Sequence, residues 1–520
     1  TSIKSIDKMN NFDGYVYDLN IEDNHNYLTE MGLVHNSGKR NGNFAIYLEP
    51  THPDIQNFID LRKNHGNEAE RCRELFTAIW IPDLFMEKVK ADEEWCLFCP
   101  SKCPDLSDVY GEKYKILYEK YEKENKFEKK VKAQELWISI CSAQKETGTP
   151  YLCFKDACNL KSNQQNIGTI KSSNLCSEII EYSDSNETAV CNLASIALPS
   201  YINNNKFDYD KLHYTAKVLT KNLNKVIDKS FYPIKQTKKS NDRHRPIGIG
   251  VQGLADVFAI LKIPFDGNEA KEINKKIFET IYHGALEMST ELAETYGTYD
   301  TYVDSPIYNG KLQFDLWNVT VDNSLWDWDK LRLDIGKYGI RNSLLIALMP
   351  TASTSQILGF NECFEPFTSN IYNRRTLAGE FFIINKYLIN ELIQLKLWNT
   401  NMKTKIIENK GSIQNIEEIP IQLREIFKTA FEIHPKTIIE LSADRAPFIC
   451  QSQSMNLFID DTDINKISNM HFYSWKKGLK TGIYYLRTRP SARVQSFTQE
   501  AKSYKQEEPE ELEECLNCSA

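Results

Sequence analysis

Three polar side chains at alternate positions form the first candidate reaction centre of this 520-residue chain. Asn174, Cys176 and Glu178 lie within the segment SSNLCSEIIEY, and an extended backbone would point all three toward one face. A thiol between an amide and a carboxylate could react, with the carboxylate as general base and the amide orienting a hydroxyl. Cys191 follows downstream and could act as a reductant. The alternative is that both thiols are inert buried residues.

A second pair of thiols, Cys515-x-x-Cys518, lies in the acidic segment TQEAKSYKQEEPEELEECLNCSA. In a reduced compartment this spacing indicates a redox dithiol or half of a zinc site. The segment CLFCPSKC (96–103) could supply other zinc ligands, but no histidine lies near either cluster at the spacing of a zinc finger. Because an acidic segment with few apolar residues is mobile, the composition favours exchange with another disulfide. Incidental cysteines are the alternative.

Two further segments contain candidate functional side chains. In MPTASTSQILG (349–359) a strand-like run ends at Pro350, and the hydroxyls and backbone N–H groups of Thr351, Ser353 and Thr354 precede a helical pattern. Such a helix start can bind a phosphate or diphosphate, although an ordinary Ser/Thr cap is the commoner use. The adjacent Tyr484 and Tyr485 lie in an apolar run, where such aromatics are usually core residues facing opposite sides.

A glycine pattern raises a different possibility. Gly248, Gly250 and Gly253 have the G-x-G-x-x-G spacing, and Asp266 follows near the distance expected for a ribose-binding acid. This supports a nicotinamide-dependent (NAD-type) oxidoreductase as an alternative. The fingerprint needs a strand before the first glycine, yet the preceding KKSNDRHRP is not a buried strand. The pattern is therefore weak.

Composition narrows the class of protein. The chain is 41% hydrophobic and 26% charged, with a net charge of −8, which is typical of a soluble globular protein. The acidic balance gives no nucleic-acid footprint, and no apolar run is long enough for a membrane span. The absence of a signal-peptide pattern predicts a cytoplasmic chain with reduced thiols. Thirteen scattered cysteines also argue against a disulfide framework.

Helical patterns alternate with short apolar runs along the chain. Amphipathic periodicity predicts helices over 207–228 and 268–297, the second ending at Gly297. The runs at 246–251, 343–350 and 481–488 predict buried strands. This alternation predicts an α/β fold with a barrel or a wound sheet.

Taken together, these segments resemble the large, catalytic subunit of class I ribonucleotide reductase. The resemblance runs from about Ser37 to Ala520 and rests on SNLCSEIIEY, AVCNLAS, RHRPIGIGVQGLAD, YGIRNSLLIALMPTASTSQILG, EPFTSNIYNRR, HFYSWKKGLKTGIYYLRTRP and ECLNCSA, which occur in family order. It implies a partial ten-stranded α/β barrel over 37–495, with a finger loop carrying the radical cysteine. A flexible tail with the redox pair would follow at 496–520.

The resemblance also implies roles. Cys176 would become a thiyl radical and abstract the 3′-hydrogen of a ribonucleoside diphosphate, Glu178 would accept the 3′-hydroxyl proton, and Asn174 would hydrogen-bond the sugar. Cys191 would be one of two reducing cysteines, and Cys515 and Cys518 would reduce the resulting disulfide. The residues implied in radical transfer are Tyr484 and Tyr485, and those implied in substrate binding are Ser173, Pro350, Thr351, Ala352, Ser353 and Thr354.

The family's N-terminal portion is absent from this sequence. That portion normally holds the activity domain, most of the specificity effector site, the first part of the barrel and the cysteine that pairs with Cys191. The resemblance implies no metal or cofactor bound directly by this chain; the metal or radical cofactor would belong to a small subunit. The implied partners are that small subunit, thioredoxin or glutaredoxin, a second large subunit and the upstream half.

Residues 1–36 resemble the C-terminal end of an intein, a self-splicing insert. Three segments match the expected strand, turn and terminal strand, in this order: VYDL, EDNHNY, and LVHN followed by Ser. Asn36 would cyclise, His35 would protonate the leaving amine, His25 would activate the junction, and Ser37 would accept the upstream chain. The alternative for residues 1–36 is an N-terminal arm of divergent sequence. A self-processing fragment without reductase activity of its own is the alternative for the whole chain.

Overall fold

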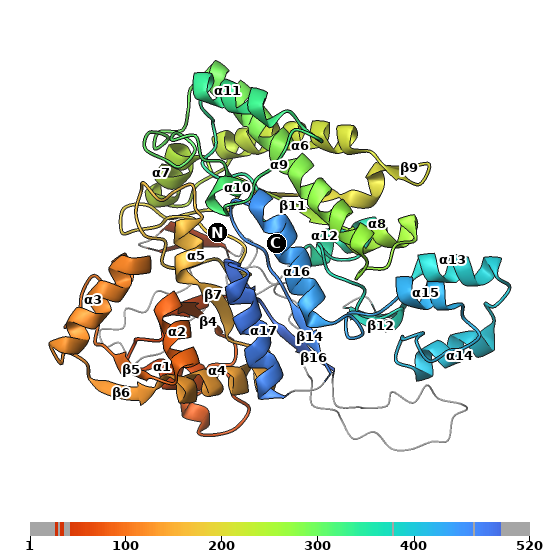
Figure 1. The fold of residues 1–520 in the computed structure, drawn as a ribbon, viewed down its shortest axis with the longest axis horizontal. Helices are drawn as coiled ribbons and strands as arrows, with labels where there is room; N and C mark the ends of the chain where they lie inside the picture. The colour runs from red at the N-terminus through yellow and green to blue at the C-terminus, as the bar shows by residue number, and fades with distance from the viewer. Residues whose placement is uncertain (1–25, 30–31, 36–41, 377–378, 461–462, 490–520) are drawn as a thin grey trace.

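The computed structural model describes residues 26–29, 32–35, 42–376, 379–460 and 463–489 (Figure 1). The helices are α1 (Ile55–Asp60), α2 (Asp83–Ala91), α3 (Gly111–Lys123), α4 (Ala133–Thr147), α5 (Lys155–Leu160), α6 (Tyr209–Lys229), α7 (Lys235–His244), α8 (Leu254–Leu261), α9 (Asn268–Tyr296), α10 (Gln313–Leu316), α11 (Trp328–Tyr338), α12 (Ala352–Leu358), α13 (Lys386–Gln394), α14 (Thr400–Glu408), α15 (Ile421–Ile426), α16 (Pro435–Arg445) and α17 (Ile464–Lys476). Within these residues no helix is both long and apolar enough to cross a membrane.

The strands are short and scattered along the chain. They are β1 (Asn26–Thr29), β2 (Gly32–His35), β3 (Ala45–Leu48), β4 (Phe76–Ile81), β5 (Glu94–Leu97), β6 (Lys129–Lys132), β7 (Tyr151–Phe154), β8 (Leu193–Ala197), β9 (Ile202–Asn203), β10 (Lys206–Phe207), β11 (Gly248–Gln252), β12 (Ile371–Thr376), β13 (Gly379–Ile384), β14 (Leu457–Ile459), β15 (Thr481–Ile483) and β16 (Leu486–Thr488). The predicted mixed α/β content is therefore confirmed.

Two parallel groups of strands meet at one antiparallel junction. In the first group β8 pairs with β11, Ile249 bridges to Ile346, Leu348 bridges to Gln453, and β14 pairs with β16, all in parallel. In the second group β3, β4 and β7 are parallel neighbours. The junction is the antiparallel pair of β15 and β7. The described residues form no closed barrel, so the predicted ten-stranded barrel is not seen as such.

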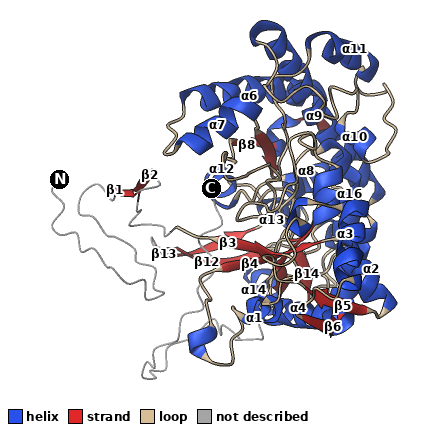
Figure 2. Ribbon diagram, turned by 90° about the vertical axis from the view of Figure 1, so that its left-hand side faces the viewer, coloured by secondary structure: helices blue, strands red, loops and turns tan. Residues whose placement is uncertain are grey.

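Helices lie above these strands and on one side of them. In Figure 2 α6 and α9 lie above β3, β4 and β14, and α2 and α16 lie to their right. The amphipathic pattern predicted at 207–228 forms α6, whose buried face carries Leu212, Ala216 and Leu223. The pattern at 268–297 forms α9, and the backbone turns away at Gly297, where φ is +79°. These two predictions are confirmed.

Other predictions of extended structure were only partly right. The run at 343–350 is buried but contributes isolated bridges rather than a named strand. The run at 481–488 breaks into β15 and β16 at Tyr484 and Tyr485. At the N-terminus β1 and β2 form an antiparallel hairpin with Asn26 opposite His35. The strand expected at VYDL (16–19) lies outside the described residues.

A smaller unit follows the central strands. The β12–β13 hairpin and helices α13, α14 and α15 share an apolar cluster separate from the main core, which includes Leu388, Leu392, Met402 and Phe427. In Figure 1 these helices project to one side of the body that holds the paired strands. The candidate site described below belongs to neither of these two clusters, because Cys176, Tyr484 and Tyr485 form a third apolar cluster.

Candidate active site

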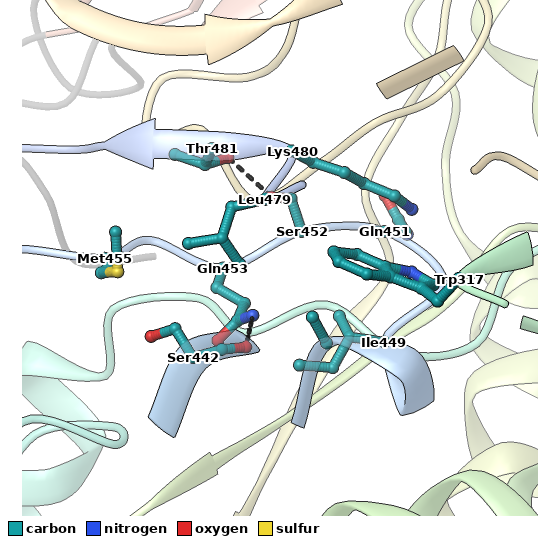
Figure 3. A pocket seen from close by; sticks show the side chains of 11 residues that line it. Trp317, Ser442, Ile449, Gln451, Ser452, Gln453, Met455, Leu479, Lys480 and Thr481 are labelled. Carbon is teal, nitrogen blue, oxygen red and sulfur yellow. Dashed lines mark hydrogen bonds between the residues drawn. The ribbon is translucent and has the colours of Figure 1, made fainter. Parts of the chain in front are cut away.

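Cys176 lies in a tight turn between α5 and β8, not on an extended segment. Residues 175–177 turn back on themselves, and Ser177 has a positive φ of 62°, which is costly for a residue with a Cβ. The turn is held from outside, because the Thr481 hydroxyl donates to the Ser177 carbonyl oxygen at 2.6 Å. The Thr481 hydroxyl also bonds that of Ser452, 2.6 Å away (Figure 3). The predicted extended geometry was wrong, although the three residues do converge.

The turn brings Asn174 and Glu178 into direct contact. The Asn174 side-chain N–H donates to Glu178 Oε1 at 2.9 Å. Its Oδ1 accepts the backbone N–H groups of Glu178 and Ile179, each at 3.2 Å. On an extended chain two residues four positions apart would be about 13 Å apart. The amide therefore both closes the turn and holds the carboxylate in place.

Ser454 connects the same carboxylate to the backbone of Cys176. Its Oγ lies 2.9 Å from Glu178 Oε2 and 2.7 Å from the Cys176 carbonyl oxygen. A hydroxyl has one proton to donate, so it cannot satisfy both acceptors while Glu178 is ionised. When Glu178 is protonated, its own O–H can donate to Ser454, which then donates to Cys176. Burial raises the pKa of Glu178 to about 7, although the bonds from Asn174 and Ser454 lower it.

Cys176 is in hydrogen-bond contact with an aromatic pair from the far end of the chain. The Tyr484 hydroxyl lies 3.3 Å from Cys176 Sγ. The rings of Tyr484 and Tyr485 are 4.4 Å apart between centroids and tilted by 59°. All three residues are buried in one small apolar cluster. The two tyrosine rings therefore contact each other, and the Tyr484 hydroxyl contacts the thiol. The two rings are tilted rather than stacked in parallel.

Comparison with known proteins identifies the family of this chain. The family described as "Ribonucleotide reductase, barrel domain" matches residues 27–485. The chain belongs to the ribonucleotide reductase family. It is similar to the ribonucleoside-diphosphate reductase large chains of Cryptosporidium parvum (58% identity, covering 91% of this chain and 59% of that protein) and Schizosaccharomyces pombe (56%, covering 88% and 57%). It is also similar to the large subunit of Vaccinia virus (55% identity, covering 92% and 62%).

A solved structure shares this fold. The Actinobacillus ureae class Id ribonucleotide reductase alpha subunit superposes with a TM-score of 0.65 at 25% identity, covering 86% of this chain and 71% of that one. The chain spans between 57% and 62% of the length of the three curated relatives named above. The barrel domain is therefore present, and it represents part of a longer reductase subunit in those relatives.

Three residues of this reductase site carried no recognisable signal in the sequence. Ser454 is one, because it contacts Glu178 across 276 positions of sequence. Tyr151 on β7 is another; its hydroxyl donates to that of Tyr485 at 2.8 Å. The third is Tyr47, whose hydroxyl donates to the Asn174 carbonyl oxygen at 2.7 Å. Tyr151 and Tyr47 lie on strands β7 and β3, and Ser454 lies in the polar run CQSQS before β14, so local sequence spacing does not single any of them out.

The predicted redox cysteines are not brought together by the described residues. Cys191 is exposed and precedes β8, and it is a free thiol. Cys515 and Cys518 lie outside the described residues. Every cysteine within the described ranges is free. The redox roles of these three cysteines stay predictions.

The predicted phosphate loop has the expected local structure. Helix α12 begins at Ala352, directly after Thr351. The Thr351 hydroxyl is buried and accepts the backbone N–H of Cys363 at 2.8 Å, so it shapes the loop. Thr354 is exposed, whereas Pro350, Ala352 and Ser353 are half-buried. Ser173 donates to the Ile179 carbonyl oxygen at 2.7 Å. Substrate binding by these residues stays a prediction.

The glycine fingerprint does not form a dinucleotide loop. Gly248 and Gly250 lie inside strand β11, where the fingerprint requires a turn. A Cβ at Gly248 would lie 2.6 Å from the Leu193 side chain, and one at Gly250 would lie 2.5 Å from Met349 Sδ. The two glycines thus permit close packing between neighbouring strands. This geometry removes the basis for the nicotinamide alternative.

The residues predicted to splice are mostly outside the described part of the chain. His25, Asn36 and Ser37 lie outside it. His35 is the last residue of β2, which agrees with the predicted terminal strand. Their chemistry stays a prediction.

Proposed function

We propose that this chain supplies the catalytic barrel of a ribonucleoside-diphosphate reductase, which converts ribonucleoside diphosphates to deoxyribonucleoside diphosphates for DNA synthesis. The contact between the Tyr484 hydroxyl and Cys176 Sγ at 3.3 Å carries the proposal. It places a redox-active phenol against a buried thiol that has a carboxylate and an amide two residues away on either side. Those groups fit a radical reaction on a sugar that carries hydroxyls.

The first step would generate the thiyl radical. A small subunit would supply an oxidising equivalent that reaches Tyr485 and then Tyr484. The Tyr484 phenoxyl would take the hydrogen atom of the Cys176 thiol, which gives a neutral tyrosine and a thiyl radical. Burial suits this step because an exposed thiyl would be quenched by solvent. The two atoms are 3.3 Å apart, so the thiol hydrogen would have only a short distance to move to the phenoxyl oxygen.

The second step would act on the substrate. The thiyl radical would abstract the 3′-hydrogen, Glu178 would accept the proton of the 3′-hydroxyl, and the 2′-hydroxyl would leave as water. After reduction at C2′, Cys176 would return the hydrogen to C3′ and Glu178 the proton to the 3′-oxygen, which regenerates the thiyl radical. Two electrons and two protons would come from Cys191 and a second cysteine in the upstream portion, and these two would close to a disulfide. A raised pKa near 7 suits Glu178 for this work, because a base is most effective when its pKa lies near the working pH.

The third step would recharge the site. Cys515 and Cys518 would reduce the disulfide at Cys191 by thiol–disulfide exchange, and a thioredoxin- or glutaredoxin-type dithiol would reduce the pair in turn. Because the chain spans about three fifths of its relatives, we propose that it acts with its upstream portion and a second large subunit. Nucleotide effectors would bind mainly in that upstream portion.

The test is reduction of CDP with the upstream portion, a small subunit and a dithiol supplied. Turnover is expected for the unaltered chain and none for Cys176→Ser. Cys141 is also a buried thiol, on α4 and away from Cys176, so Cys141→Ser is a matched control that should retain turnover. Turnover that survives Cys176→Ser would refute the radical role.

We also propose that residues 1–36 are the C-terminal end of an intein. The sequence matches at VYDL, EDNHNY and LVHN support this proposal. The antiparallel hairpin of β1 and β2, whose second strand ends at His35, also supports it. With the upstream intein part supplied, intact-mass analysis should show cleavage after Asn36. Asn36→Ala should abolish that cleavage, whereas Asn24→Ala should allow it. An Asn36→Ala chain that is still cleaved there would end the proposal, and a chain that splices without ever reducing CDP would leave only the self-processing alternative.

A further inference from the structure

A group of metal-ligating side chains lies between helices α6 and α9, on a different part of the fold from Cys176. His283 and Glu287 are one helical turn apart on α9, so their side chains lie on one face. His213 faces them from α6. Within the described ranges this is the group of three histidine, cysteine or carboxylate residues whose ligand atoms all lie within 4.8 Å of one another.

His213 Nε2 lies at nearly coordination spacing from the other two ligand atoms, and all three atoms lie within 4.8 Å of one another. His213 Nε2 lies 2.8 Å from His283 Nδ1 and 3.3 Å from Glu287 Oε2. A tetrahedral ion with bonds of about 2.0–2.1 Å holds neighbouring ligand atoms about 3.3 Å apart. The carboxylate is therefore at the required distance, and the two rings need to separate by about half an ångström. Such a shift is within the reach of side-chain rotation.

The packing of the two helices brings the ligands together. Gly284 follows His283 directly, and a Cβ there would lie 2.6 Å from the His213 carbonyl oxygen. Glycine thus allows α6 to approach α9 closely at this point. Trp326 then covers both imidazoles, with its ring 4.1 Å from that of His213 and 5.4 Å from that of His283, both nearly parallel. The rings are held in position before any ion binds.

Glu287 contributes a carboxylate to the group, and a lysine contacts that carboxylate from the same pair of helices. Lys217 lies 3.2 Å from Glu287 Oε1 and 2.6 Å from Glu291 Oε1. It therefore contacts the other oxygen of the Glu287 carboxylate and has Glu291 as a second partner. Glu287 Oε2 remains directed at His213.

We propose that His213, His283 and Glu287 bind one divalent transition-metal ion, with zinc as the best match, in a site that clamps α6 to α9. Two histidines and a carboxylate form a three-ligand zinc set that leaves a fourth position for water. In the bound state the proton of His213 lies on Nδ1, which frees Nε2 for the metal. The proposal does not depend on the reductase function, because it concerns a different part of the fold.

Zinc titration of the full, chelator-treated chain tests the site. Cys515→Ser and Cys518→Ser should be present in every protein compared, so that the terminal thiols do not compete. This background is expected to bind one more equivalent of zinc than the same chain with His283→Gln, and zinc should raise its melting temperature. His65 is exposed and lies beside Glu146, so His65→Gln is a control that should bind as the background does.

Glu287→Gln keeps the result decisive if His283→Gln does not fold, because the Glu287 side chain is only partly buried. Its zinc affinity should fall at least about tenfold, the loss that even removal of an outer-shell partner typically causes. The proposal is overturned if the background shows no saturable binding. It is equally overturned if folded His283→Gln or Glu287→Gln binds zinc with unchanged stoichiometry and affinity.

Discussion

The hydroxyl of Tyr484 lies 3.3 Å from the sulfur of Cys176, although 308 positions of sequence separate them. Tyr485 extends this contact toward Tyr151, whose hydroxyl donates to that of Tyr485 at 2.8 Å. Three phenols and one thiol are thus linked within one buried cluster. Turnover here means CDP reduction with the upstream portion, a small subunit and a dithiol supplied.

Tyr484→Phe should abolish turnover while it changes stability little. The substitution removes the hydroxyl that contacts Cys176 and keeps the ring that packs on Tyr485. The free energy of unfolding should fall by about 1 kcal/mol, the usual contribution of one hydrogen bond. Urea denaturation and CDP reduction measure the two effects. Tyr118→Phe is the matched control, because it removes a buried hydroxyl that accepts a backbone bond from Cys96 elsewhere; a similar loss of turnover there would count against the specific role.

Turnover should rise with pH through about pH 7. Burial raises the pKa of Glu178 to about 7, so the carboxylate that accepts a proton becomes the main form only above that pH. The folded pKa lies above the unfolded value, so the folded state binds the extra proton, and ionisation of Glu178 destabilises the fold as pH rises from about 4.5 to 7. Relative to Glu178→Gln, the unaltered chain should therefore lose stability over that window.

Glu181 provides the control for that pH effect. It is a second buried carboxyl, its pKa is raised to about 8 by burial, and it accepts a bond from Gln451 at 3.1 Å. Glu181→Gln should show a similar relative change in stability with pH but keep the pH dependence of turnover. If the rise in turnover near pH 7 vanishes in Glu181→Gln and persists in Glu178→Ala, the assignment of the base is wrong.

Ser454→Ala should move the acidic limb of the pH profile to higher pH. The Ser454 hydroxyl stabilises the ionised form of Glu178 and so lowers its pKa. Without that hydroxyl the pKa of Glu178 should rise further, and turnover should need a higher pH to reach its plateau. Measurement of kcat against pH would show the shift. An unchanged profile with lower kcat at all pH values would mean that Ser454 acts by holding the Cys176 turn.

The long helices could be predicted from the sequence, whereas the details of the site could not. Helices α6 and α9 each repeat an apolar face over five or more turns, and that periodicity is local information. The turn at Cys176 is different, because it is held by Thr481 and Ser454 from distant segments. Local spacing predicted an extended chain there, and nothing near Cys176 points to Ser454. The resemblance to the reductase family implied the roles of the site residues, whereas only the three-dimensional contacts reveal their partners Ser454 and Thr481.

Gly250→Ala tests the packing explanation of the glycine pattern. An added Cβ would lie 2.5 Å from Met349 Sδ and 3.0 Å from the Ala347 carbonyl oxygen, so the neighbouring segment would have to shift. Overpacking of this kind typically costs about 1–3 kcal/mol, measurable as a lower urea midpoint. Gly336→Ala is the matched control, because Gly336 lies in helix α11 with nothing within 4 Å of the new Cβ. There the change should stabilise by about 0.5–1 kcal/mol, since alanine favours a helix more than glycine does. If Gly250→Ala were as stable as the unaltered chain, close strand packing would not explain why glycine occupies β11, and its fingerprint would need another account.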